Sequence, residues 1–436
     1  MAELIPILST AEPDFERRFA VIRQRSAVAS PAVEEQARRI VADVRRRGDR
    51  ALIEYTRRYD GVRLSPEELE VDPDEMTAAT RSLRPAELRA LKLAARRIEA
   101  FHRRQVQRSW RYRDRAGLTL GQRVIPLRRV GVYVPGGHGS YPSSVLMNAI
   151  PALVAGVNEV IMVSPVTAAG YSPAVLAAAD IVGVSAMFRV GGAQAVAALA
   201  YGTERVPAVD KIVGPGNAWV QAAKRQVYGH VDIDKIAGPS EIVVITDGSV
   251  PPSYAAADLL AQAEHGSGEE CAVLLTPSRA VAEAVRAAIA VQLQSLPRRA
   301  AIARVLRRRG ALVVVRGMIE AVGLAEQIAP EHLELLVADA GRWPNSIRNA
   351  GAIFVGPHSC APLGDYAAGP NHVLPTGGTA RFSSPLGVYD FVKRTSVVRA
   401  SPRALRTLAP AITTLAELEG YQAHAAAVRV RLKGGR

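Results

Sequence analysis

Two glutamate–histidine pairs are the first residues in this sequence whose types and spacing could do chemistry. Glu264 and His265 stand in the segment QAEHGSGEE, and Glu331 and His332 stand in IAPEHLELL. Histidine is scarce, with eight in the chain, yet two of them directly follow a carboxylate. Such neighbours can hold a metal ion or divide the work of general acid–base catalysis. Because their settings differ, the two pairs can have different roles.

The first pair lies at the end of a predicted helix. Gln262 and His265 are three residues apart, so they share one face of that helix. The imidazole of His265 and the side-chain carbonyl of Gln262 are both acceptable to Zn²⁺, although glutamine is an unusual ligand. The alternative is a polar helix end with a histidine that the helix dipole favours. Spacing alone leaves both interpretations open.

The second pair follows a proline. Pro330 discourages helix continuation, so Glu331 and His332 are expected at an element boundary, before a strand-like segment. A carboxyl group and an imidazole at the edge of a loop can share general acid–base catalysis. The alternative is a surface pair with one side chain packed beneath the strand.

Four further polar residues complete the candidates. Asp365 and His372 lie in LGDYAAGPNH, and Glu419 and His424 lie in the C-terminal tail. On one continuous helix the two tail residues would point about 140° apart, at about 100° per residue. Gly420 indicates a helix end between them, which would let both converge on one site. Simple exposure is the alternative for a histidine in a tail.

Two glycine-rich turns could approach a phosphate. Residues 134–144 and 213–220 both lie between a predicted strand and a predicted helix, where backbone N–H groups can meet a nucleotide. Neither matches G-x-G-x-x-G. The turns could therefore be ordinary connections between a strand and a helix, or they could bind a nucleotide. Nucleophilic chemistry is poorly supported. Ser240 lacks a G-x-S-x-G elbow, and Cys271 and Cys360 have no basic neighbour close in sequence.

The elements that must position these residues alternate between strand and helix. The first 120 or so residues are predicted to be helical, and two successive runs of alternating strands and helices follow. This pattern predicts two related Rossmann-like α/β domains with parallel sheets covered on both faces. A segment after residue 357 is rich in Gly, Pro and Ser, which is typical of a functional loop. The predicted units are 1–123, helical; 124–240, first α/β domain; 241–375, second α/β domain; and 376–436, a C-terminal extension with a helical tail.

Composition narrows the class of protein. The chain has 436 residues, 48% of them hydrophobic, which is enough for two or three domains. Its net charge is +14, almost all from arginine, but no nucleic-acid-binding motif occurs, so we expect solvated helix faces and no nucleic-acid partner. Two cysteines make no disulfide framework. No signal peptide or membrane-spanning run is recognisable, and a cytoplasmic protein is expected.

Taken together, long stretches of the sequence resemble the histidinol dehydrogenase family. The resemblance runs from about residue 30 to the C-terminus. It is densest in GVYVPGGHGSYPSSVLMNAIPALVAGV, VDKIVGPGN, DIDKIAGPSEI, ADLLAQAEH, APEHLEL, LGDYAAGPNHVLPTGGTARFSSPLGVYDF and LEGYQAHAAAV. Two short segments depart from the family. GSGEE follows QAEH where Asp-Pro is frequent, and PHSCAP precedes LGDY where a stretch like Thr-Pro-Glu is frequent.

The resemblance implies an enzyme that oxidises L-histidinol to L-histidine through histidinaldehyde, with two NAD⁺, in the last step of histidine biosynthesis. It implies one Zn²⁺ per subunit, which holds the substrate. The second α/β domain would serve zinc and substrate, and the first would bind NAD without the standard fingerprint. The metal ligands would be Gln262, His265, Asp365 and His424.

The resemblance also assigns roles to individual residues. His332 would take the hydroxyl proton, and Glu331 would activate water for the aldehyde step. Ser240, His372 and Glu419, with His332 and the four metal ligands, would contact the substrate; Tyr133, Gln194 and Asn217 would contact NAD. The family forms a homodimer with an intertwined tail, so Glu419 and His424 would complete the active site of the partner subunit.

Three other functions are alternatives to this one. A related dehydrogenase could act on another small primary alcohol, although GPNHVLPT and the spacing of Glu419 and His424 favour histidinol. A nucleic-acid-binding protein would show steeply salt-dependent binding to duplex DNA. A metallohydrolase would need an open metal position and no NAD, which the double α/β layout disfavours.

Overall fold

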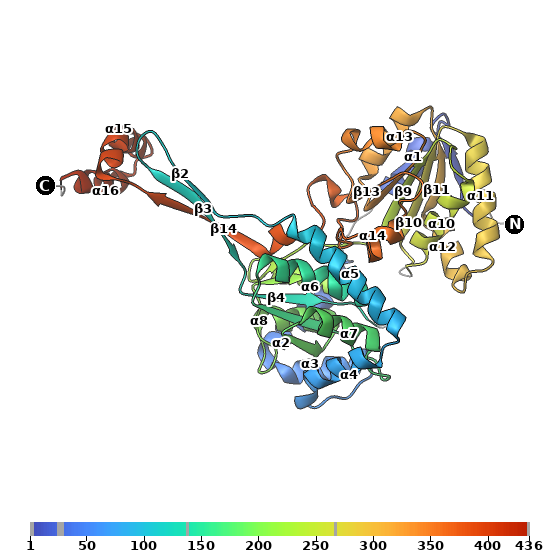
Figure 1. The fold of residues 1–436 in the computed structure, drawn as a ribbon, viewed down its shortest axis with the longest axis horizontal. Helices are drawn as coiled ribbons and strands as arrows, with labels where there is room; N and C mark the ends of the chain where they lie inside the picture. The colour runs from blue at the N-terminus through green and yellow to red at the C-terminus, as the bar shows by residue number, and fades with distance from the viewer. Residues whose placement is uncertain (1–3, 24–29, 137–138, 266–267, 434–436) are drawn as a thin grey trace.

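The computed structural model describes residues 4–23, 30–136, 139–265 and 268–433. Two parallel β-sheets, each covered by helices on both faces, form the main body (Figure 1). A long antiparallel arm leaves this body and carries two helices at its far end (Figure 1). The predicted fold class, two Rossmann-like parallel-sheet units with a helical C-terminal tail, is confirmed.

The first parallel sheet has the strand order β6-β5-β4-β7-β8. Its strands are β4 (Arg129–Tyr133), β5 (Glu159–Ser164), β6 (Ala186–Arg189), β7 (Lys211–Val213) and β8 (Asp232–Ile233). Alternate residues of β5 enter different cores: Val160 and Met162 pack on one face and Ile161 and Val163 on the other. A strand buried on both faces is continuously apolar, as this one is.

Eight helices cover the first sheet. One face carries α2 (Pro31–Arg47), α3 (Asp49–Tyr59), α8 (Gly192–Tyr201) and α9 (Ala218–Val227). The other carries α4 (Pro73–Ser82), α5 (Pro85–Arg103), α6 (Pro142–Ala155) and α7 (Pro173–Val182). The short 3₁₀ helix η1 spans Glu67–Leu69. Ser30 caps α2, accepting a hydrogen bond from Val33 N at 3.4 Å with Pro31 in the first turn.

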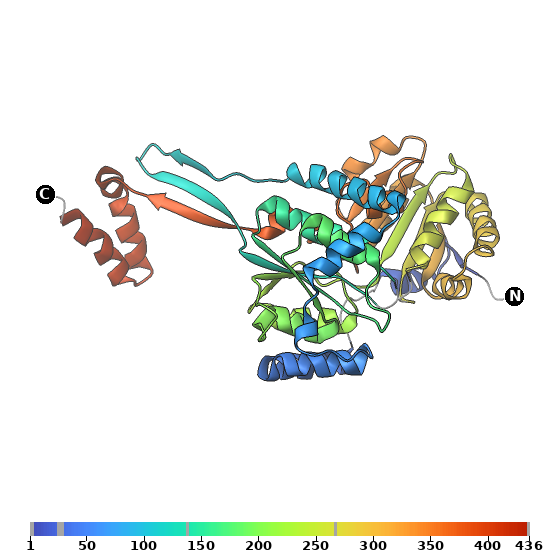
Figure 2. The same ribbon diagram turned by 60° about the horizontal axis from the view of Figure 1, so that its bottom comes forward.

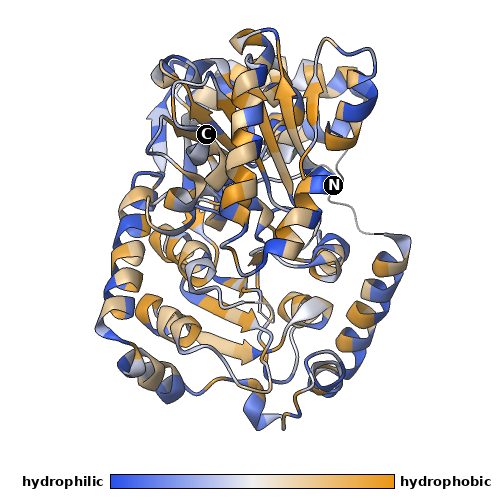
Figure 3. Cartoon of the chain, turned by 90° about the vertical axis from the view of Figure 1, so that its right-hand side faces the viewer, coloured by the Kyte–Doolittle hydropathy of each residue, from blue (hydrophilic) through white to orange (hydrophobic). Residues whose placement is uncertain are grey.

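The second parallel sheet has the order β1-β11-β10-β9-β12-β13. Its strands are β1 (Ile7–Ser9), β9 (Glu241–Thr246), β10 (Cys271–Thr276), β11 (Gly310–Val314), β12 (His332–Leu336) and β13 (Ala352–Val355). Helices α10 (Pro252–Ala263), α11 (Arg279–Leu293) and α12 (Arg299–Arg309) cover one face; α1 (Phe15–Arg23) and α13 (Met318–Ile328) cover the other. Figure 3 shows hydrophobic residues concentrated on the strands and hydrophilic residues on the outer helices.

The N-terminal segment differs from the helical region that we predicted for 1–123. Strand β1 pairs in parallel with β11, and α1 packs against α13, so these residues join the second sheet. The reason is apolar burial: Leu8, Phe15 and Phe19 lie in the core of the second unit. Strands at 110–113 and 119–126 also interrupt the predicted helical region. The division into domains stays a prediction.

The arm consists of β2 (Trp110–Arg113), β3 (Thr119–Pro126) and β14 (Val392–Arg399). Strand β14 pairs with β3 in antiparallel register from Val392↔Pro126 to Arg399↔Thr119, which joins distant parts of the sequence. Beyond it, α15 (Pro402–Leu418) and α16 (Gln422–Lys433) pack on each other, well away from both parallel sheets (Figures 1 and 2). Gly420, at φ +79°, separates the two helices, as its position in the sequence predicted.

The Gly- and Pro-rich segment after residue 357 is more ordered than the predicted loop. It forms the short helix α14 (Ala361–Tyr366) and the 3₁₀ helices η4 (Thr379–Arg381) and η5 (Val388–Phe391). Helices η2 (Ala340–Arg342) and η3 (Pro344–Ser346) precede it. Within the described residues, no helix is both long and apolar enough to cross a membrane.

Candidate active site

His332 lies at the centre of the site as the first residue of β12. Its side chain is almost fully buried, at 3% exposure. Ring atom Nδ1 lies 3.2 Å from the carbonyl oxygen of Glu241, and Nε2 lies 3.5 Å from Oδ1 of Asp365. A carbonyl can only accept, so Nδ1 carries the proton in that hydrogen bond. Nε2 is therefore the ring nitrogen that can exchange a proton.

Glu331 is held from several sides. Its Oε2 accepts a short hydrogen bond from the Ser240 hydroxyl and another from Glu241 N, at 2.9 Å. The Glu241 carboxylate in turn accepts from the backbone N–H of Glu331, at 3.2 Å. Oε2 of Glu331 also lies 3.6 Å from Nδ1 of His332. The predicted element boundary is confirmed, but both residues are buried, so the interpretation as a surface pair is wrong.

Asp365 and His372 meet at the same place. Nδ1 of His372 donates to the backbone carbonyl of Asp365 at 2.8 Å, and Nε2 lies 3.4 Å from the hydroxyl of Ser144. Ser144 stands in the first turn of α6, which covers the first sheet, whereas Asp365 stands on α14 beside the second. His372 therefore links the two parallel-sheet units at the site.

The charges of the site shift two pKa values in opposite directions. Burial alone would lower the pKa of His332, but the charges of Glu331 and Asp365 and its hydrogen bonds raise that pKa to about 9. Burial would raise the pKa of Asp365, but its bond and charge attraction to His332 outweigh this and lower it. The charges of His372 and His265 add to that lowering of the pKa of Asp365. Burial lowers the pKa of His372 itself.

Gln262 and His265 do not share a helix face as predicted. Helix α10 ends at Ala263, and His265 lies beyond it, exposed, with Nδ1 3.1 Å from the carbonyl of Gln262. The helix stops early because a glycine- and serine-containing segment follows. Gln262 is buried, and its amide Nε2 has no hydrogen-bond partner among the described residues. Of the departing segment 266–270, positions 266 and 267 lie outside the described residues.

The two tail candidates are separated from this cluster. Glu419 ends α15 and His424 stands on α16, both exposed, at the far end of the arm (Figure 1). His424 has Tyr421 as its ring neighbour, with centroids 5.0 Å apart. One subunit therefore does not bring Glu419 and His424 to His332.

The predicted cofactor residues lie at the carboxyl edge of the first sheet. Tyr133 ends β4, and its buried hydroxyl accepts from Gly192 N at 3.1 Å. Gln194 is buried in the first turn of α8, next after β6. Asn217 follows β7 and caps α9, accepting from Trp219 N and Val220 N at 3.1 Å each. In the strand order, β4 and β7 neighbour each other where the connections change direction, which is where doubly wound sheets bind nucleotides.

Comparison with known proteins agrees with this geometry. The family profile described as histidinol dehydrogenase matches residues 23–432. The histidinol dehydrogenase of Rhizobium meliloti is 52% identical over 98% of this chain and 98% of its own length. That of Syntrophotalea carbinolica is 52% identical over 99% of this chain and its full length. This chain belongs to the histidinol dehydrogenase family.

A solved structure supports the same assignment. The crystal structure of histidinol dehydrogenase from Elizabethkingia anophelis superposes with a TM-score of 0.93, at 32% identity, covering 99% of both chains. Histidinol dehydrogenases are NAD-dependent oxidoreductases of the last step of histidine biosynthesis, so the predicted family and class of activity are confirmed.

Several residues near the site carry donor atoms of the kinds that zinc accepts. The described residues contain no group of three or more His, Cys, Asp or Glu side chains that could hold a metal ion. Gln262 is buried; its unpartnered Nε2 is an N–H donor, and the carbonyl oxygen of the same amide is the atom that could bind a metal ion. Amide oxygen, imidazole and carboxylate are all donors that zinc accepts. Gln262, His265 and Asp365 thus suit a metal that requires another donor.

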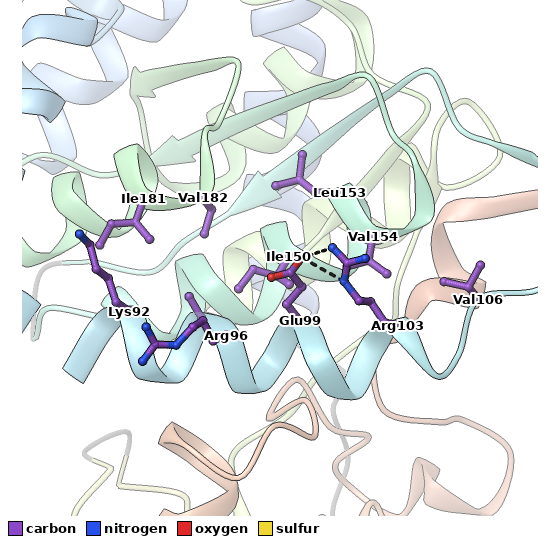
Figure 4. Close-up of a pocket in the computed structure, with 11 residues that line it drawn as sticks. Lys92, Arg96, Glu99, Arg103, Val106, Ile150, Leu153, Val154, Ile181 and Val182 are labelled. Atoms are coloured by element: carbon purple, nitrogen blue, oxygen red, sulfur yellow. Dashed lines mark hydrogen bonds and ion pairs between the residues drawn. The ribbon is translucent and has the colours of Figure 1, made fainter. Parts of the chain in front are cut away.

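Sequence reasoning missed two residues of the site. Glu241 fixes the backbone of Glu331 and, through its carbonyl, the tautomer of His332. Ser144 contacts His372. Glu241 and Ser144 both lie in segments that resemble the family, and that resemblance was the feature of the sequence that could have identified them. A separate surface groove of about 690 Å³ lies between α5, α6 and α7 (Figure 4) and contains none of the predicted site residues.

Proposed function

We propose that this chain oxidises L-histidinol to L-histidine in two NAD-dependent steps through histidinaldehyde, using the predicted site residues. The observation that carries the proposal is the burial of His332 between Glu331 and Asp365. That arrangement supplies a proton acceptor and a separate carboxyl group within reach of one another. An alcohol oxidation followed by a hydrated-aldehyde oxidation needs both.

In the first step His332 takes the hydroxyl proton of the alcohol at Nε2. The hydride leaves the same carbon for the nicotinamide ring, and the aldehyde forms. The hydrogen bond from Nδ1 to the Glu241 carbonyl keeps Nε2 available. The negative charges of Glu331 and Asp365 favour the protonated form of His332. For His332 to be neutral, one of these charges must be balanced by a cation. Asp365 is a proposed ligand of the metal ion, whose positive charge would balance it.

In the second step Glu331 takes a proton from water as the water oxygen adds to the aldehyde carbon. Because Glu331 keeps that proton, the hydrate forms in its singly deprotonated state, and loss of a hydride to a second NAD⁺ would leave the carboxylic acid. Ser240 and the backbone N–H of Glu241 hold Oε2 of Glu331, so its other oxygen can face the water. The hydrogen bond from Ser240 supports a role for it beside Glu331, and its contact with the substrate is proposed from the family resemblance.

The metal site is proposed to contain Gln262, His265 and Asp365, with His424 from a second subunit. Zinc bound there would hold the substrate by its nitrogen atoms and orient it. His372 and Glu419 would contact the substrate, and Tyr133, Gln194 and Asn217 the NAD. In this proposal the second unit serves zinc and substrate, and the first serves the cofactor.

A homodimer with shared sites accounts for the tail. The arm places α15 and α16 far from the other site residues of their own subunit (Figure 2). Leu415, Leu418 and Tyr421 are exposed at 59%, 78% and 55%, which is unusual for large apolar side chains gathered in one segment. A partner subunit that buries them would receive Glu419 and His424. The cytoplasm is the compartment we propose.

The test is the amount of NADH formed for each L-histidinol consumed by purified protein, before and after chelation of zinc. Two NADH for each substrate, abolished by the chelator and restored by zinc, is the expected result. NADH formed from another primary alcohol but not from histidinol would transfer the proposal to that substrate. Activity that survives complete removal of zinc would contradict the metal's role.

A further inference from the structure

Two buried carboxyl groups lie beneath the site and have no role in the proposed reaction. Asp258 stands on α10, and Glu334 stands on β12. Glu334 is fully buried and Asp258 is 8% exposed. A hydrogen bond between the two carboxyl groups is among the causes that shift the pKa of each. Two carboxyl groups can form such a bond only when one of them carries a proton.

The hydrogen bonds around Glu334 indicate which group carries that proton. Oε1 of Glu334 accepts from the backbone N–H of Ala361 at 2.6 Å. Oε2 is buried and receives no hydrogen bond from an N–H or hydroxyl group of the described residues, so a proton on this oxygen would have the carboxyl group of Asp258 as its acceptor. Burial, reinforced by the charge of Asp258, raises the pKa of Glu334. Burial also raises the pKa of Asp258, although its bond to Glu334 opposes this.

These bonds connect three elements that each carry a site residue. Along β12, His332 and Glu334 are two residues apart and therefore point to the same face. Along α10, Asp258 and Gln262 are four residues apart and share a side of the helix. On α14, Asp365 lies four residues after Ala361. His332 is thus one strand repeat from Glu334, and Gln262 is one helical turn from Asp258. Asp365 is one helical turn from Ala361, the residue whose N–H binds Glu334.

We propose that Asp258 and Glu334 are positioning residues that hold α10, β12 and α14 in register, and so set the spacing of Gln262, His332 and Asp365. The inference rests on the proposed function, because it assumes that Gln262 and Asp365 bind the same metal. Helix α14 has six residues, and the hydrogen bond from Ala361 N to Glu334 fixes the first of them. Breaking a buried pair also leaves polar groups unpaired, which the structure relieves by shifting.

The test measures zinc affinity of the full-length protein by competition with a chromogenic chelator. Glu334→Leu removes both bonds and should weaken zinc binding about 10- to 100-fold, the usual loss for a residue that orients a ligand. Glu334→Gln keeps an acceptor for Ala361 and gains an amide donor for Asp258. It should bind zinc as the wild type does. Rescue by the amide would exclude a simple loss of volume.

A matched control separates positioning from general destabilisation. Asp180 is a carboxylate in the first unit that accepts from Thr77 at 3.2 Å and Thr80 at 2.6 Å and links α7 to α4. Asp180→Ala should lower the melting temperature without changing zinc affinity. Should Glu334→Leu fail to fold, Glu334→Asp, shorter by one methylene, is the second variant, and its zinc affinity should also fall.

Two results would overturn the inference. One is a folded Glu334→Leu or Glu334→Asp variant that binds zinc as tightly as the wild type. The other is an equal loss of zinc affinity in Asp180→Ala, which would make the effect a general one. Failure of the proposed function is distinguishable, because the wild-type protein itself would then bind no zinc or form no NADH, and both proposals would fall together.

Discussion

The two parallel sheets contribute to the site from opposite edges. In the first sheet Tyr133 ends β4, and Gln194 and Asn217 follow β6 and β7, so the predicted cofactor contacts lie at the carboxyl edge. In the second sheet Ser240 directly precedes β9 and His332 begins β12, so the residues proposed to act on the substrate lie at the amino edge. Open α/β sheets generally bind ligands at the carboxyl edge. The proposed cofactor site on the first sheet follows this rule, and the proposed substrate site on the second sheet does not.

This difference follows from what each edge offers. At the carboxyl edge, glycine turns and helix N-termini present N–H groups suited to a nucleotide. At the amino edge, the chain returns from helix to strand, and buried side chains such as Glu331 can be held by backbone groups of the neighbouring strand. His372, bonded to Asp365 and close to Ser144, connects the two edges. The comparison predicts that cofactor binding and acid–base chemistry can be damaged separately.

The largest effect is expected from His332→Ala. Loss of the proton acceptor should lower kcat for histidinol oxidation about 10²- to 10⁴-fold. Zinc content should stay near that of the wild type, because His332 is not a proposed ligand. Steady-state NADH formation and metal analysis on the same preparation check both points. His230→Ala, an exposed histidine stacked on Tyr201, is the control and should retain activity. Loss of zinc in His332→Ala would mean that its role is misassigned.

Glu331→Gln should separate the two oxidations. Oxidation of histidinaldehyde should fall by about 10²-fold or more, and oxidation of histidinol by less, because only the aldehyde step needs activated water. The measurement is single-turnover NADH formation with each substrate in turn. The glutamine side chain keeps an oxygen that can accept from Ser240. Equal losses for both substrates would contradict the assignment of water activation to Glu331.

Asp365→Ala tests whether metal binding at the amino edge of the second sheet is independent of cofactor binding at the first. It should weaken zinc binding by at least about 10- to 100-fold, the loss found even for residues that merely orient a ligand. NAD⁺ affinity, measured by titration calorimetry, should be unchanged because the cofactor residues lie at the edge of the other sheet. Parallel losses of zinc and NAD⁺ affinity would indicate that the two edges do not act independently.

The smallest effects are expected at Asn217. Asn217→Ala removes the cap of α9 and should reduce the free energy of unfolding by about 1 kcal/mol. Asn217→Asp keeps a capping oxygen but adds a negative charge beside the cofactor's phosphates, so it should raise the Kd for NAD⁺ while leaving the melting temperature unchanged. An unchanged Kd in both variants would remove Asn217 from the cofactor site. Thermal unfolding and NAD⁺ titration give the two readouts.

Much of the fold could be predicted from local sequence patterns, and the failures have physical causes. Continuous apolar runs and regular helical spacing identified the strands and helices of both sheets. Strand β1 was missed because three residues carry little periodic signal, and its burial depends on β11, far along the chain. Strand β14 was missed for a similar reason, since its exposed, polar residues are ordered by pairing with β3.

The residues of the candidate site also differ in whether they could be predicted from the sequence. The Glu331–His332 pair was visible because a proline and a strand surround it. The roles of Glu241 and Ser144 could not be read from the sequence, because each depends on a contact with a residue far along the chain. The connection of Glu419 and His424 to the site came from family resemblance alone, since one subunit keeps them apart.

The most direct test of the account is an anomalous difference map at the zinc absorption edge, from crystals grown with zinc and NAD⁺. We expect one peak per subunit at the amino edge of β9 and β12. It should lie about 2.0 to 2.2 Å from donor atoms of Gln262, His265 and Asp365 and of His424 of the partner subunit. A peak at the carboxyl edge of either sheet, or one without a ligand from a second subunit, would contradict it.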